Sequence, residues 1–139
     1  MTVVLDTTVA SFVLKGDSRA ALYATHFAGA TLVLSFQTVA ELLRGARAAN
    51  WGTRRQEELR QGLARFVHRE SNSKTVEEWA NLMDGSKRAG QALSVQDAWI
   101  AATAAELGAT LVTHDGDFNA VSCPGLTIVR YDDAGRRQR

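Results

Sequence analysis

Short apolar segments rich in β-branched residues recur along the chain and predict the strands of a buried sheet. They cover residues 2–5, 31–34, 110–113 and 126–129, with a shorter segment at 66–68. The first of them shows no alternation of polar and apolar positions, which is typical of a strand buried on both faces of a parallel sheet. It ends at Asp6.

Between these segments, apolar positions recur every three or four residues, which predicts amphipathic helices. The predicted helices cover residues 7–14, 18–29, 36–50, 53–65, 75–90 and 94–107. Gly16, Gly29 and Gly108 each follow a helical segment, as expected of helix C-terminal caps. Strands alternating with helices predict a three-layer α/β/α domain, with a central parallel sheet and right-handed crossovers.

Length and composition are those of one ordinary domain. The chain has 139 residues, 45% hydrophobic residues, one proline and no internal repeat. We expect residues 1–131 to form the domain and residues 132–139 to be a frayed, basic C-terminal tail.

Two features bear on cellular location. The N-terminal apolar segment is far shorter than the roughly 18 residues needed to cross a membrane, so we expect a cytoplasmic protein without membrane contact. Cys123 is the only cysteine, so it cannot form an internal disulfide, and cysteine and histidine are not spaced as in zinc sites.

Arginines are concentrated in the middle of the chain although the net charge is only +1. Residues 44–69 contain seven arginines and two acids, and three more arginines end the chain. Arginine binds phosphate oxygens in pairs, so this distribution favours a polyanionic partner. Arg44, Arg54 and Arg55 are the candidate RNA-binding residues. A solvated helix face is the alternative explanation.

Acidic residues fall at one predicted edge of the sheet. Asp6 and Asp115 lie just beyond the carboxyl ends of two strands, where open parallel sheets bind ligands. Glu41 lies in the helix after the second strand, and Asp97 lies in the first turn of the helix before the Asp115 strand. Asp97 faces the predicted buried stripe, with no lysine or arginine within one helical turn.

Each acid also has a local explanation. Asp6 could cap the following helix, Glu41 could pair with Arg44, and Asp97 could complete a capping box. Asp115 or the neighbouring Asp117 could close a turn. These alternatives stay open for each residue taken singly, but the predicted topology brings the whole set to one rim.

A set of adjacent carboxylates needs compensation. Two such charges about 4 Å apart repel by roughly 4 kcal/mol at an effective dielectric constant near 20. A divalent cation removes this conflict, and an all-oxygen ligand set suits Mg²⁺ or Mn²⁺. Such a site can activate water and stabilise the leaving oxygen of a phosphodiester.

Three segments resemble the motifs of a known family in the correct order. The segment LDTTVASFVLKGD at 5–17 resembles the opening motif of PIN domains, TVAELLRGA at 38–46 resembles the second, and QDAWIAATAAELGATLVTHDGDF at 96–118 is similar to the third and fourth. The resemblance covers nearly the whole chain. At this length it is closest to the VapC toxins of type II toxin–antitoxin systems.

The resemblance implies an endoribonuclease dependent on Mg²⁺ or Mn²⁺, acting on structured RNA such as tRNA. It also implies a homodimer and a cognate VapB-type antitoxin that inserts into the active-site groove. Asp6 and Asp97 would be the principal metal ligands, Glu41 a ligand directly or through water, and Asp115 the fourth acid. The supporting residues would be Asp117 at a second metal, with Thr7 and Thr113 orienting ligands or phosphate. Thr8 departs from the family pattern, which often has asparagine there.

Two other functions were weighed against this one. An aspartyl-phosphate phosphohydrolase or receiver domain also has an aspartate after its first strand, but it needs a second one two residues later, where this chain has Thr8. A catalytically silent RNA- or protein-binding module on the same fold is the remaining alternative. Such a module would have little reason to keep a set of mutually repelling acids.

Overall fold

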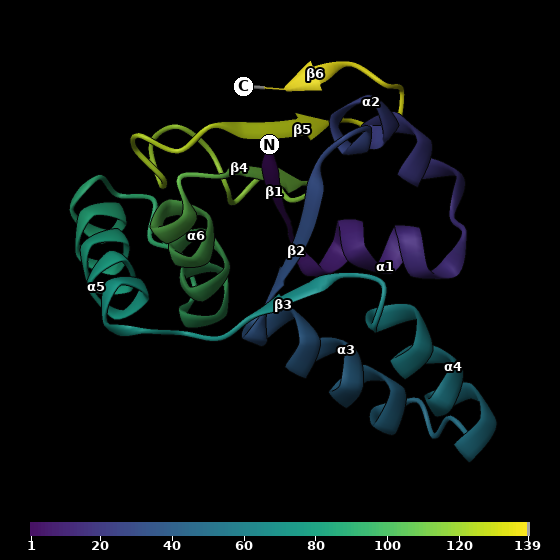
Figure 1. Cartoon of the computed structure of the whole chain (residues 1–139). Coiled ribbons are helices and arrows are strands. Elements are labelled where there is room, and N and C mark those ends of the chain that lie inside the picture. The colour runs from purple at the N-terminus through teal and green to yellow at the C-terminus, as the bar shows by residue number, and fades with distance from the viewer. Residues whose placement is uncertain (139) are drawn as a thin grey trace.

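Six strands form one sheet in the computed structural model, which describes residues 1–138. The strand order is β3-β2-β1-β4-β5-β6 (Figure 1). Their bounds are β1 Thr2–Leu5, β2 Thr31–Ser35, β3 Val67–Arg69, β4 Thr110–Thr113, β5 Ile128–Tyr131 and β6 Arg137–Gln138. The first five strands are parallel, as predicted, and β6 is antiparallel to β5.

The central position of β1 follows from its apolar sequence. Val3, Val4 and Leu5 are at most 1% exposed, because helices cover both faces of the strand. Val4 pairs with Val33 of β2 on one side and with Leu111 of β4 on the other. The carboxyl ends of β1 and β4 therefore lie side by side.

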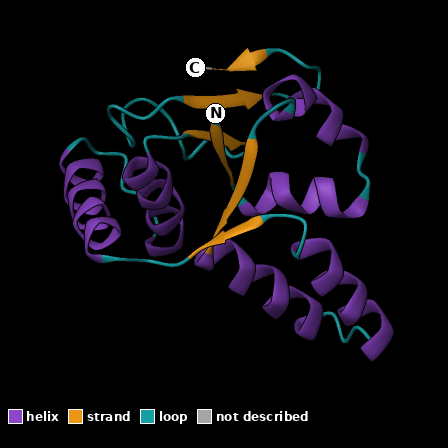
Figure 2. Cartoon of the chain, in the orientation of Figure 1, coloured by secondary structure: helices purple, strands orange, loops and turns teal. Residues whose placement is uncertain are grey.

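Helices cover both faces of the sheet, which confirms the predicted three-layer arrangement (Figure 2). Helices α5 (Ser73–Arg88) and α6 (Val95–Leu107) pack on one face. Helices α1 (Thr7–Lys15), α3 (Phe36–Ala48) and α4 (Thr53–Leu63) pack on the other. Up to Gln138, the chain forms no helix with both the length and the hydrophobicity that a membrane span requires.

The segment predicted as one helix over 18–29 is divided in the structure. It forms a 3-10 helix, η1 (Ser18–Tyr23), followed by a single α-helical turn, α2 (Ala24–Phe27). Asp17 caps η1 by accepting a hydrogen bond from the Arg19 N–H at 2.9 Å. Tyr23 ends η1 and is fully buried, so its tertiary contacts override the helical preference of the alanine-rich segment.

The C-terminal segment also differs from the expectation of a frayed tail. Residues 132–136 form a turn, in which the Asp132 carboxylate accepts hydrogen bonds from the N–H groups of Ala134 and Arg136 at 3.0 and 2.9 Å. The turn leads into β6, which pairs with β5. The last residue of the predicted tail, Arg139, lies outside the described residues.

Candidate metal centre

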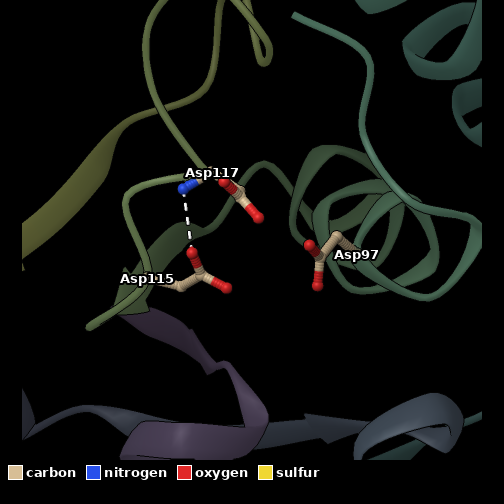
Figure 3. Close-up of side chains that lie close together, drawn as sticks. All are labelled: Asp97, Asp115 and Asp117. Atoms are coloured by element: carbon tan, nitrogen blue, oxygen red, sulfur yellow. Dashed lines mark hydrogen bonds between the residues drawn. The ribbon is translucent and has the colours of Figure 1, made fainter.

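Three aspartates meet at the carboxyl edge of the sheet. Asp97 comes from the first turn of α6, and Asp115 and Asp117 come from the loop after β4. One carboxylate oxygen from each lies within 4.8 Å of the other two. Figure 3 shows the three side chains directed toward a common space.

Local hydrogen bonds set the shape of this cluster. The Asp117 N–H donates to the Asp115 carboxylate at 2.9 Å, the dashed line in Figure 3, and this closes the turn after β4. On the opposite side, the Ser94 hydroxyl accepts a hydrogen bond from the Asp97 N–H at 3.0 Å and so caps α6. The turn and capping roles considered for these acids are thus present, and they orient the carboxylates of the cluster.

Asp6 lies behind the cluster and is buried, with 2% of its surface exposed. It caps α1, with one carboxylate oxygen accepting from the Val9 N–H at 2.8 Å. The other oxygen accepts from the Thr113 hydroxyl at 2.5 Å. The same hydroxyl accepts from the Asp115 N–H at 2.9 Å, so Thr113, a predicted supporting residue, links Asp6 to the cluster.

Glu41 faces α1 from α3 and lies outside the group of three aspartates. Its carboxylate accepts hydrogen bonds from the Thr7 hydroxyl and from the Gln37 amide, the latter at 3.1 Å. The Thr7 hydroxyl also lies 3.2 Å from that of Thr38. The alternative pairing of Glu41 with Arg44 is not among the ion pairs formed within residues 1–138.

Burial and mutual repulsion raise the pKa of two of these acids. Burial and then the charge of Asp115 raise the pKa of Asp97 from 3.8 to about 6, against a hydrogen bond from Ser94. Burial likewise raises the pKa of Asp6 to about 6, although the hydrogen bond from Thr113 opposes this. In the described part of the chain, no lysine or arginine forms an ion pair with these acids or with Glu41.

This donor set fits a hard divalent cation. The three clustered carboxylates offer only oxygen ligands, lie close together and lack a protein cation, which is the condition under which Mg²⁺ or Mn²⁺ binding is favourable. Asp97, Asp115 and Asp117 would hold the ion. Asp6 adds a buried negative charge behind them, linked through Thr113.

The candidate RNA-binding arginines lie on the helices beside this site. Arg44 on α3 is exposed, and Arg54 on α4 is exposed and paired with Glu58 at 3.3 Å. The Arg55 guanidinium lies 3.9 Å from the centre of the Trp51 ring. Arg55 and Glu41 line the same surface pocket of about 630 Å³ between α1, α3 and α4.

Sequence reasoning did not anticipate Tyr23 and His114 beside the site. The Tyr23 hydroxyl donates to the Thr113 carbonyl at 2.9 Å and lies 2.5 Å from His114 Nδ1. The position of His114 between Thr113 and Asp115 was a usable signal. Tyr23 gave none, because it lies 90 residues away from Thr113 in sequence.

The fold and the site together define an open α/β domain with an acidic, cation-binding type of site at the carboxyl edge of its sheet. The model of the PIN domain family matches residues 3–122, so the chain belongs to the PIN domain family. No curated protein matches the sequence.

Solved structures show the same fold at low sequence identity. A chain of VapBC2 from Rickettsia felis, bound to a promoter DNA fragment, is similar with a TM-score of 0.80 and 23% identity, over 95% of this chain and 100% of that one. A chain of VapBC-1 from nontypeable Haemophilus influenzae has a TM-score of 0.74 and 24% identity, over 92% and 96% of the two chains. A chain of VapBC-5 from Mycobacterium tuberculosis has a TM-score of 0.67 and 24% identity, over 94% and 98%.

Proposed function

We propose that this PIN domain is a divalent-metal-dependent endoribonuclease and the toxin of a VapBC-type toxin–antitoxin pair. The observation that supports it most directly is the group formed by Asp97, Asp115 and Asp117, whose oxygens lie within 4.8 Å of one another without a protein cation. Close carboxylates of this kind are compatible when a divalent cation binds them.

The proposed metal is Mg²⁺, with Mn²⁺ as a substitute. When bound, it would supply an activated water and charge stabilisation for hydrolysis of an RNA phosphodiester. Asp97 and Asp115 hold the ion, and Asp117, expected from sequence only to assist a second metal, joins them. Asp6 supports the site from behind, and Glu41 acts through water because it lies outside the group.

The proposed substrate is structured RNA such as tRNA. Arg44, Arg54 and Arg55 provide exposed positive charge beside the acidic edge, where RNA phosphates would be held electrostatically. The proposed partners are a VapB-type antitoxin and a second copy of the chain, and the proposed place of action is the cytoplasm. The similarity in fold to chains of VapBC complexes supports the antitoxin partner.

Cleavage of end-labelled RNA tests the nuclease. We expect cleavage by the purified chain with Mg²⁺ or Mn²⁺, its loss with chelator, and its loss in Asp97→Asn and Asp115→Asn. Asp84→Asn is the matched control, because Asp84 is an exposed acid on α5 that pairs with Arg88. Full activity of Asp97→Asn, or activity in chelator, would reject the metal mechanism and favour a catalytically silent binding module.

Growth and binding assays test the toxin assignment separately. Expression of the chain alone should arrest growth, and co-expression with the product of the neighbouring gene should restore it. Asp97→Asn should be harmless when expressed alone and should still bind that product. A nuclease that is active in the test tube but harmless in cells would retain the metal mechanism and refute the toxin role.

A further inference from the structure

The hydroxyl of Tyr23 joins three segments that are distant in sequence. Tyr23 ends η1 and is fully buried. Its Oη donates to the Thr113 carbonyl at 2.9 Å, accepts from the Tyr131 N–H at 3.2 Å, and lies 2.5 Å from His114 Nδ1. One buried oxygen therefore connects η1, the loop after β4 and the end of β5.

The backbone at Thr113 and His114 supports the acidic site directly. The Thr113 hydroxyl donates to Asp6 and accepts from the Asp115 N–H. The His114 backbone N–H is a further hydrogen-bond donor to Asp6. A displacement of this short segment would move the support of Asp6 and the carboxylate of Asp115 together.

The His114 ring continues the connection to the surface. Its Nε2 lies 2.7 Å from an Asp133 carboxylate oxygen, and its edge packs against Phe12 with ring centroids 5.1 Å apart. Asp133 lies in the turn between β5 and β6 and is largely exposed. This C-terminal hairpin lies beyond residues 3–122, which the family model matches.

We propose that Tyr23 is a positioning residue for the metal centre, holding segment 113–115 through a hydrogen-bonded chain of Tyr23, His114 and Asp133. This inference rests on the proposed metal-dependent function. Repulsion among the clustered aspartates pushes the loop outward when no metal is bound, so a fixed backbone lowers the cost of assembling the ligand set. Groups that orient metal ligands in this way typically change metal affinity when they are removed.

The chain's two tyrosines provide a matched pair of variants. Tyr23→Phe removes the hydroxyl at the site, whereas Tyr131→Phe removes one that lies 2.8 Å from His26 Nε2 instead. Mn²⁺ affinity is measured without RNA, from the electron paramagnetic resonance signal of free Mn²⁺. We expect Tyr23→Phe to raise the Mn²⁺ dissociation constant about 10- to 100-fold. Tyr131→Phe should stay within about twofold of the wild type. Excess Mn²⁺ should restore RNA cleavage by Tyr23→Phe.

The outcomes separate positioning from a purely structural role. A lower melting temperature for Tyr23→Phe with wild-type Mn²⁺ affinity would overturn the inference. If Tyr23→Phe does not fold, Asp133→Ala decides, since Asp133 is exposed: a dissociation constant raised about threefold supports the chain, and an unchanged one overturns it. A wild-type chain that binds no Mn²⁺ would refute the proposed nuclease mechanism itself.

Discussion

Replacing Asp97 with Asn should stabilise the metal-free protein while it abolishes RNA cleavage. Asn keeps the size of the side chain and can still accept the hydrogen bond from Ser94, but it removes one of three neighbouring charges. The pKa of Asp97 is raised from 3.8 to about 6, mainly by burial and then by Asp115. At 1.36 kcal/mol per unit, the charged carboxylate costs the folded state at most about 3 kcal/mol at pH 7.

The sign of the pH dependence follows from the raised pKa. Below pH 3.8 the Asp97 carboxyl is protonated in both the folded and the unfolded chain, so it carries no penalty. The penalty grows as the pH rises from 3.8 to about 6 and is complete above that. Asp6, whose pKa is also raised to about 6, acts in the same direction. The metal-free wild type should therefore lose stability over this window, and Asp97→Asn should lose less.

Thermal unfolding followed by circular dichroism, in chelator at pH 7 and at pH 4, measures this difference. For a chain of this length, each kcal/mol corresponds to roughly 3 to 5 °C in melting temperature. Asp97→Asn should melt several degrees above the wild type at pH 7 and near it at pH 4, with Asp84→Asn unchanged at both. Mn²⁺ should stabilise the wild type and not the variant. A variant that is less stable than the wild type by the same amount at both pH values would refute the reasoning.

Three further predictions concern the surroundings of the site. Thr113→Val, which removes the hydroxyl shared by two acids, should weaken Mn²⁺ binding about 10- to 100-fold in the same resonance assay; unchanged binding would contradict the linking role. Replacing Arg54 and Arg55 with Ala should lower the salt dependence of RNA binding by about 0.7 per lost phosphate contact, measured by filter binding, and an unchanged slope would place them off the RNA surface. Glu106→Gln weakens the ion pair with Arg69 and should cost about 1–3 kcal/mol in urea unfolding at pH 7. Because Arg69 lowers the pKa of Glu106, this difference should shrink as the pH falls below 4.5 and should not grow.

Elements with strong local signals could be predicted from sequence. The strand at residues 2–5 and the helix caps at Gly16 and Gly108 are present where expected, with the two glycines at φ 67° and 61°. The 3-10 helix ending at Tyr23 and the hairpin after Asp132 were not predicted. Both depend on contacts with segments far away in sequence, such as the Tyr23 hydroxyl bond to Thr113, which leave no periodic pattern.

The candidate site was located by the rule that parallel strands end at one edge, but its grouping required side-chain positions. Sequence placed Asp6, Asp97 and Asp115 at that edge. The structure groups Asp117 with Asp97 and Asp115, and it sets Asp6 behind Thr113. The turn after β4 decides this grouping, since its backbone directs two aspartates to the same side.

The sheet ends on either side in a very short strand. The outer strand β3 has three residues, and β6, at the other border, has two. Unpaired backbone groups on a long, flat outer strand can recruit a strand from another molecule, whereas short ones offer little to pair with. A concentrated solution of this protein should consequently resist strand-to-strand aggregation, even though the interior of its sheet is almost entirely aliphatic.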